Sequence, residues 1–457
     1  MTTRLTSLAA WLLLALPAAG SGQPAAGSGQ RAAGSGQLAA GSTQQAAGRS
    51  FELGALQQAA IDSDPRLQEL QLLTTQSELR LRNIAAARLP SIVVDGQAQY
   101  QSDVPTPPLT LPGGRPLFSP AKATYDSGLR IDQRIFDATI DAQGALERAQ
   151  LAEQQARVRT TLFSLRQQVN EAYFAAAALQ ARAGALAAAV SDLDARLTET
   201  NVRVREGAAI PADAAAIEAT LLQRRQDEDE LRASRRAALA RLATLTGQAV
   251  TEDDTLALPD LPAAVARARQ APGDLRARPE YDQFARTRER LARQQEAATA
   301  QERPRISTFA RLGFGRPGLN FISDQFESYG LGGVRVQWNA WTWGTAGRER
   351  EALAIQQQVV AADQAAFAKG LSESIEGDEA AFDRLQRALA LDERIVTLRE
   401  QVERSTQLRL QEGVVTASEY LDRSAELLQA RFARAGHQVE LAQAGARLLT
   451  TLGLEVR

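Results

Sequence analysis

Two stretches of this chain are versions of one helical hairpin, and this duplication constrains the fold more than any other feature. The first stretch, Arg203–Glu218, reads RVREGAAIPADAAAIE, and the second, Arg409–Glu426, reads RLQEGVVTASEYLDRSAE. Each contains a glycine, Gly207 or Gly413, that suits the left-handed residue at a helix end because glycine has no Cβ to clash. Both stretches follow a long helical pattern, so each is predicted to end a helix.

Both stretches also carry signals that start a returning helix. Pro211 suits a first helical turn, where no N–H partner is needed. Thr416 and Glu419, three residues apart, form a capping-box pair. Each stretch is therefore predicted to be a tight reversal between two helices.

The two hairpins are equivalent points in a duplicated chain. At one constant spacing, one set of residues matches another: Arg203, Glu206, Gly207, Asp213, Arg241, Leu242, Thr244 and Gly247 match Arg409, Glu412, Gly413, Glu419, Arg447, Leu448, Thr450 and Gly453. We therefore expect two structural repeats, at 51–247 and 273–457, joined by a proline-containing linker at 248–272.

The start of the chain looks like an export signal. In Met1–Ala19, Arg4 precedes the apolar run Leu8–Leu16 and small residues follow, as in a secretory signal peptide. The alternative is a membrane anchor, but the run is shorter than the ~20 residues that a spanning helix needs. Residues 20–50, rich in Ala, Gly, Ser and Gln, are expected to form a flexible low-complexity tail.

Composition excludes several classes of function. The net charge of −2 argues against a nucleic-acid binder, and without cysteine there is no disulfide, thiol nucleophile or acylated N-terminal cysteine. The single histidine, His437, supports neither a catalytic triad nor a metal site and is expected on a surface or helix seam. The acidic run Glu373–Asp383 is interpreted as a solvated helix face rather than a cation site. No enzyme activity, cofactor or metal is therefore predicted.

Each repeat contains two stretches in which apolar and polar residues alternate. Strands with one apolar and one polar face are predicted at four places: Ser91–Gln101, Tyr125–Ile135, Ile306–Gly315 and Gly332–Trp341. Long helices are predicted at Thr139–Glu206 and Gly344–Glu412, and returning helices at Ala212–Thr246 and Thr416–Leu452. The first returning helix is about half as long as its partner, so the helical stretch Phe51–Arg88 is expected to stack end to end on it.

These strands favour a membrane β-barrel. Each has about 10 residues, the length that crosses the hydrocarbon layer at a tilt, whereas no stretch after the signal is apolar enough to cross as a helix. Aromatic residues gather at the strand ends, as in membrane-interface girdles: Tyr100, Tyr125, Phe326, Tyr329, Trp338, Trp341 and Trp343. The alternative is two amphipathic hairpins packed on the helices. Since the smallest barrels have about eight strands, four strands require oligomerisation.

The sequence resembles the TolC-like outer membrane efflux proteins over roughly 51–454. The resemblance is carried by the duplicated plan, by Leu89-Pro90 and Arg303-Pro304 before strands, by Ile135-Phe136-Asp137 and Trp341-Thr342-Trp343-Gly344 after strands, and by VNEAYF at Val169–Phe174. The family implies a mainly α fold with a transmembrane β-barrel. In it, a homotrimer builds a 12-stranded barrel among outer membrane lipids and a periplasmic α-barrel from the helices.

The resemblance also implies partners and site residues. The hairpins would dock a periplasmic adaptor (a membrane fusion protein) that is coupled to an inner-membrane transporter. The implied docking residues are Arg203, Glu206, Gly207, Ala208, Ala209, Ile210, Arg409, Glu412, Gly413, Val414 and Val415. Glu419 and Asp422, three apart and so on one helix face, would form acidic rings at the channel entrance, with Asp213 as a weaker candidate. Glu419 as a capping residue, and Asp422 as an ordinary solvated acid, remain alternatives.

The implied function is an outer membrane exit duct of a tripartite efflux pump or type I secretion system. It would conduct cargo passively. Two rival interpretations are a periplasmic coiled-coil adaptor and a scaffold or adhesin without a channel. The cargo stays open among drugs, metal ions, metabolites and proteins, as do the identity of the adaptor and whether the resting channel is open or closed.

Overall fold

The computed structural model describes residues 48–104, 121–271, 273–320 and 324–456. The expected signal peptide and most of the expected tail lie outside these residues. In chain order the elements are β1 (Ser50–Phe51), α1 (Leu53–Ser63), α2 (Arg66–Ala86), β2 (Ser91–Tyr100), β3 (Ala123–Phe136), α3 (Ala138–Arg205), α4 (Pro211–Thr246), β4 (Thr255–Leu256), α5 (Pro262–Gln270), η1 (Leu275–Ala277), α6 (Pro279–Ala300), β5 (Arg305–Arg316), β6 (Glu327–Gln337), α7 (Thr345–Gln411) and α8 (Ala417–Thr451).

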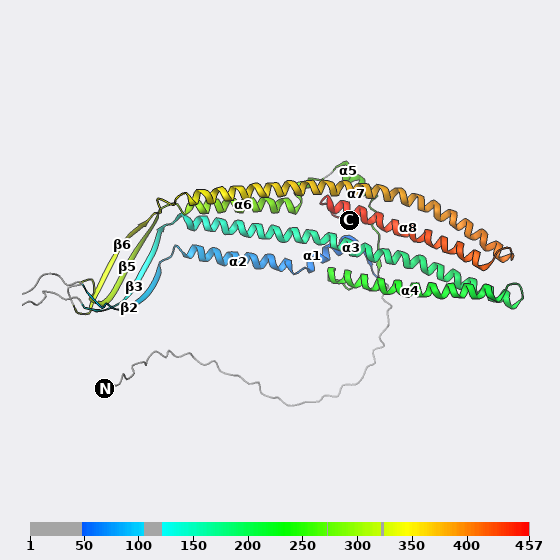
Figure 1. Ribbon diagram of the computed structural model, residues 1–457, viewed down its shortest axis with the longest axis horizontal. Helices are drawn as coiled ribbons and strands as arrows, with labels where there is room; N and C mark the ends of the chain where they lie inside the picture. Colours follow the sequence, from blue (N-terminus) through cyan, green and yellow to red (C-terminus); the bar gives the residue numbers. More distant parts are fainter. Residues whose placement is uncertain (1–47, 105–120, 272, 321–323, 457) are drawn as a thin grey trace, which may run out of the picture. The chain divides into compact units, whose positions relative to one another are not determined.

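The same order of main elements occurs twice: helix, two strands, long helix, hairpin, helix. The four long strands lie at one end of α3 and α7, and the two hairpins lie at the other end (Figure 1). The predicted long and returning helices are found with ends shifted by about one residue. The expected single helix at 51–88 is instead α1 and α2, because Asp64 precedes Pro65 and adopts extended backbone.

The shorter helices stack end to end, as the sequence predicts. The Ser63 hydroxyl at the end of α1 donates a hydrogen bond of 3.2 Å to the carbonyl oxygen of Thr246 at the end of α4. In the second half, the guanidinium of Arg278, just before α6, donates to the carbonyl oxygen of Thr451 at the end of α8. Two half-length helices therefore run beside each long helix in both halves.

The region predicted as a linker is structured and is attached to the start of the described chain. Ser50 and Phe51 form β1, which pairs in parallel with β4. Asp254, just before β4, accepts hydrogen bonds from the backbone N–H groups of Arg49 (2.9 Å) and Thr251 (2.8 Å). Two-residue strands carry no periodic signal, which is why the sequence places residues 48–50 in the tail.

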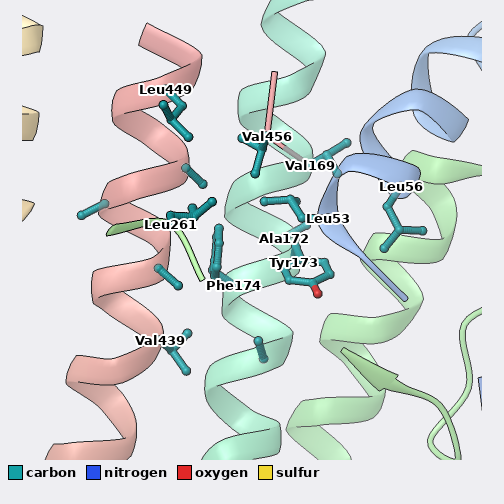
Figure 2. Close-up of a cluster of buried hydrophobic side chains, with 14 of the residues drawn as sticks. Leu53, Leu56, Val169, Ala172, Tyr173, Phe174, Leu261, Val439, Leu449 and Val456 are labelled. Carbon is teal, nitrogen blue, oxygen red and sulfur yellow. The ribbon is translucent and has the colours of Figure 1, made fainter. Parts of the chain in front are cut away.

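The main apolar core lies where these parts meet, around one segment of α3. Val169, Ala172, Tyr173 and Phe174 are at most 2% exposed, and they pack with residues of α1, α5 and α8 (Figure 2). The Tyr173 hydroxyl lies 3.0 Å from the carbonyl oxygen of Phe51 and also contacts that of Ala257. The VNEAYF stretch is thus the anchor that holds the β1–β4 segment to the helices.

The four long strands form one antiparallel sheet in the order β2-β3-β5-β6. Its two outer strands, β2 and β6, each have one edge with no strand partner among the described residues. The expected strand Gly332–Trp341 is found at Glu327–Gln337, so Trp338 and Trp341 follow it rather than lie in it. The glycines at 330, 332 and 333 hide the alternation there, because glycine supplies no side chain to either face.

The sheet exposes its apolar face. Strand pleating and register place one set of apolar side chains on the same face, and all of them are exposed: Ile92, Val94, Leu129, Ile131, Leu312, Phe314, Val334 and Val336. The opposite face is mostly polar, and on it Arg311 forms ion pairs with Asp95 (2.7 Å) and Asp126 (2.5 Å). This arrangement is the reverse of a water-soluble sheet packed on helices.

One expectation about membrane-spanning helices is wrong. Within the described residues, α3 has an 18-residue window with a mean hydropathy of 1.3, which is long and apolar enough to cross a membrane by length and composition alone. Alanine provides much of this hydropathy, since residues 172–190 are alanine-rich. The helix contacts α4, α6 and α8 along its length, which is how the chain covers part of this surface.

Candidate functional site

The first hairpin has the turn geometry that its sequence predicts. Gly207 has a φ of +75°, and the N–H of Ala208 donates a 2.7 Å hydrogen bond to the carbonyl oxygen of Arg203. This bond satisfies a carbonyl that the end of α3 would otherwise leave unpaired. Pro211 then begins α4 at its first position.

The second hairpin repeats this geometry almost atom for atom. Gly413 has a φ of +73°, and the N–H of Val414 donates a 2.8 Å hydrogen bond to the carbonyl oxygen of Arg409. Here Thr416 caps the returning helix, because its hydroxyl accepts a 3.3 Å hydrogen bond from the N–H of Glu419. Thr416 therefore makes its half of the expected capping box, whereas among the described residues the Glu419 carboxylate does not bond back to the Thr416 N–H.

The two hairpins are held together by Arg203, which the sequence marks only as a docking residue. Its guanidinium donates hydrogen bonds to the carbonyl oxygens of Leu410 (3.3 Å) and Gln411 (2.8 Å) at the end of α7. The Gln411 side chain in turn donates a 3.1 Å hydrogen bond to Glu199 of α3. The hairpins thus form one paired tip.

A groove of about 310 Å³ lies between the hairpins. Its lining includes most of the predicted docking residues: Arg203, Ala208, Ala209, Ile210, Gly413, Val414 and Val415. The predicted entrance acid Asp213 and the helix cap Thr416 also line it, together with residues that the sequence did not indicate: Arg196, Glu199, Thr200, Ile217, Gln407, Leu410, Gln411 and Ala417. Ile210 and Val414 are each 61% exposed at its edge. The other predicted docking residues, Glu206, Gly207, Arg409 and Glu412, are exposed but do not line the groove.

The three predicted entrance acids differ in their surroundings. The carboxylate of Asp213 accepts a 3.3 Å hydrogen bond from the N–H of Ala417 and so caps α8 from the other hairpin. The Glu419 and Asp422 carboxylates have no hydrogen-bond or ion-pair partner in the described part of the chain. Asp422 is exposed and Glu419 half-exposed. The carboxylates of Glu419 and Asp422 are therefore available to attract ions, whereas the carboxylate of Asp213 caps α8.

Behind the tips lies a buried polar cluster that the sequence analysis missed. Tyr420 is fully buried, and its hydroxyl donates a 3.1 Å hydrogen bond to Asp192 of α3. Burial raises the pKa of the Glu403 carboxyl and of the Tyr420 hydroxyl. A tyrosine one residue after the predicted Glu419 gives no sign that it faces inward, since the signal depends on which face of α8 meets α3.

The predicted membrane-interface aromatics lie at both ends of the sheet. Tyr100 and Tyr125 lie at the ends of β2 and β3 away from the helices, where the ring of Tyr125 is 6.2 Å from that of Phe326. Trp338, Trp341 and Trp343 lie between β6 and α7 and are more than 60% exposed. Tyr329 differs from the expectation, because it lies on the polar face, where its hydroxyl donates a 2.7 Å hydrogen bond to Asp126.

His437 also has a structural explanation. Its Nδ1 lies 2.5 Å from a carboxylate oxygen of Asp392 across the α7–α8 seam, which agrees with the expected seam position. The described residues contain no group of three or more His, Cys, Asp or Glu that could hold a metal ion.

Comparisons with known proteins identify the architecture. Residues 56–248 match the family model described as outer membrane efflux protein. The OprN outer-membrane channel is similar in structure, with 19% identity, a TM-score of 0.63, and coverage of 88% of this chain and 89% of OprN.

Two further channels have the same fold. VceC, an outer membrane protein of Vibrio cholerae, has 18% identity and a TM-score of 0.64 over 89% of this chain and 97% of VceC. The open state of MtrE, an outer membrane channel of Neisseria gonorrhoeae, has 18% identity and a TM-score of 0.62 over 89% of both chains. No curated protein sequence matches this chain.

Proposed function

Since this chain resembles the TolC-like outer membrane efflux proteins in fold and, over residues 56–248, in sequence, we propose that it is an outer membrane exit duct of a tripartite pump or type I secretion system. It conducts cargo passively from the periplasmic side to the outside of a Gram-negative-type bacterium. An inner-membrane transporter supplies the energy, and a periplasmic adaptor joins the two.

The observation that carries this proposal is the exposed apolar face of the four-stranded sheet. Eight aliphatic and aromatic side chains on it are exposed, and leaving them in water would cost each residue the ~1.5–3 kcal/mol that burial provides. Lipid covers such a face, and the polar side chains opposite then line a water-filled passage. In a soluble adaptor or scaffold, an apolar face of this kind would remain exposed to water.

The open edges of β2 and β6 support assembly into a closed barrel. An unpaired strand edge cannot face lipid, because its N–H and C=O groups would have no hydrogen-bond partner there. Pairing β6 of one copy with β2 of the next removes all edges, and a homotrimer gives the 12 strands that the resemblance implies. The two rows of exposed aromatics, near Tyr125 and near Trp341, fit the two membrane interfaces.

The paired hairpins then form the inner end of the duct, and the groove between them is the docking site for the adaptor. Its apolar rim, Ile210 and Val414, and its backbone groups suit a helical hairpin of a partner protein. Glu419 and Asp422 form acidic rings that attract cations at the entrance.

Planar-bilayer conductance of the detergent-purified protein, with its native mass measured in parallel, tests this function. A trimer that produces discrete, cation-preferring conductance steps is expected. Glu419→Ala with Asp422→Ala should weaken the cation preference, while Asp363→Ala with Glu376→Ala, an equal loss of charge on exposed sites of α7 away from the hairpins, should not. A monomer that needs no detergent and forms no pores would overturn the proposal.

A further inference from the structure

Arg203 and Arg409 occupy equivalent positions in the two repeats but have different surroundings. Arg203 is half-buried and bridges to the other hairpin of its own chain. Arg409 is exposed, and its guanidinium has no hydrogen-bond or ion-pair partner in the described residues of the chain. A single chain therefore uses one of two equivalent arginines.

The acceptors that Arg203 uses also have equivalents. Arg203 donates to the last carbonyl groups of α7, those of Leu410 and Gln411. Carbonyl oxygens at a helix C-terminus lack intrahelical partners and carry partial negative charge, so a guanidinium is well placed there. The matching groups at the end of α3 are the carbonyls of Val204 and Arg205.

The two helix ends match closely enough to accept the same contact. At the first end, the N–H of Gly207 lies 3.1 Å from the carbonyl oxygen of Val204; at the second, the N–H of Gly413 lies 3.0 Å from that of Leu410. The φ angles of the two glycines are also nearly equal, +75° at Gly207 and +73° at Gly413. An arginine can therefore approach the end of α3 in the way that Arg203 approaches the end of α7.

We propose that Arg409 makes this contact between chains. Its guanidinium donates to the carbonyl oxygens of Val204 and Arg205 of a second copy of this chain, so that the hairpins of neighbouring copies are joined as the two hairpins of one copy are. This inference rests on the proposed assembly of the duct. Around the ring of hairpins in the assembled duct, the same arginine contact then occurs alternately within one chain and between neighbouring chains.

The junction between the two hairpins of one chain is stronger than the proposed junction between neighbouring chains. Within one chain, other hydrogen bonds support the Arg203 contact, and the residues at the matching positions cannot form these bonds between chains. Asp213 accepts a bond from the N–H of Ala417 within the chain; the matching pair is Glu419 and Pro211, and proline has no N–H. The Gln411–Glu199 bond also has no match, since the equivalent positions are Arg205 and Ser405. Between neighbouring chains, the Arg409 contact therefore lacks this support from other hydrogen bonds. When the hairpins move apart, those of neighbouring chains separate before the two hairpins of one chain do.

Cross-linking tests this contact directly, because the chain has no cysteine of its own. The test pair is Arg409→Cys with Arg205→Cys, and the matched control pair is Arg203→Cys with Gln411→Cys. Both are treated with a short thiol-specific cross-linker in the intact detergent-solubilised protein. The test pair should give covalent dimers and trimers on a denaturing gel, whereas the control pair should cross-link within one chain and keep the monomer mass.

Native mass, measured on the same samples, separates the possible failures. If the protein is oligomeric but the test pair yields no covalent oligomer while the control pair cross-links, the Arg409 contact is wrong and the duct proposal stands. If the protein is monomeric, both proposals are wrong. Covalent oligomers from the control pair would also overturn the inference, because they would assign the Arg203 contact to neighbouring chains.

Discussion

Replacing Tyr173 by Phe should loosen the junction between β1, β4 and the helices without disturbing the hairpins. The Tyr173 side chain is fully buried, and its hydroxyl contacts the carbonyl oxygens of Phe51 and Ala257. Phenylalanine keeps the ring and its packing but removes this donor. The carbonyl oxygen of Phe51 retains the N–H of Ala257 at 3.1 Å, whereas that of Ala257 loses its donor.

The expected cost follows from that unpaired carbonyl. A buried acceptor that loses its donor costs about 1–3 kcal/mol. If the whole cost falls on local opening of β1 and β4, a value of about 2 kcal/mol speeds amide exchange there by roughly thirty-fold. Amide exchange in β1 and β4 measures this local opening more directly than the melting temperature of the whole protein does.

Hydrogen exchange read by mass spectrometry is the suitable assay. Peptides that contain Thr255 and Ala257, whose N–H groups donate to the carbonyls of Arg49 and Phe51, should exchange faster, while hairpin peptides should not change. Tyr281→Phe is the control, because the Tyr281 ring packs near Phe367 but its hydroxyl has no hydrogen-bond partner in the described structure. Equal exchange at β4 in wild type and Tyr173→Phe would refute the reasoning.

Three further substitutions test other parts of the structure. Gly413→Ala should destabilise the second hairpin by about 1–2 kcal/mol, because Gly413 has a positive φ. Gly377→Ala should stabilise α7 by about 0.5–1 kcal/mol, because nothing lies near the added methyl group. Thermal denaturation in which both substitutions shift the melting temperature in the same direction would contradict this. Hydrogen bonds, of which that from the Thr251 N–H is the largest cause, lower the pKa of Asp254 from 3.8 to about 2. The ionised Asp254 carboxylate therefore stabilises the fold above pH 4, and this stabilisation is lost as the pH falls towards 2. The difference in melting temperature between wild type and Asp254→Asn should shrink over that range, and a constant difference would be inconsistent with the shift. Gly313→Ala places a Cβ 2.2 Å from the Tyr329 ring, so it should lower the melting temperature, but much less in a Tyr329→Ala background; equal losses in both would show that the ring is not the obstacle.

The sequence predicts local geometry well wherever one residue type decides it. Gly207 and Gly413 both have the left-handed backbone that their positions require, and Thr416 caps α8 as expected. Alternation also predicts β2 and β3 within two residues, because their two faces meet different surroundings. These features depend on neighbours in the sequence, and such neighbours are visible in a single chain.

Contacts between distant segments could not be predicted in the same way. Arg203 binds backbone carbonyls at the end of α7. Because every residue has a carbonyl, the side chains at 410 and 411 give no indication of this contact. Asp213 is similar, since its partner is the N–H of Ala417. The polar-face position of Tyr329 is hidden in the same way, because the glycines around it obscure the pleat and its partner, Asp126, lies on another strand.

The unpaired edges of β2 and β6 have a consequence for biogenesis. The helices of one chain can form and pack from contacts within that chain, at a rate that does not depend on how many copies are present. In the proposed assembly the sheet cannot be completed in this way, because its outer strands pair with those of other chains. Until those chains arrive, the sheet presents open edges and an exposed apolar face to its surroundings. Dilution should therefore slow the last step of folding and leave the first steps unchanged.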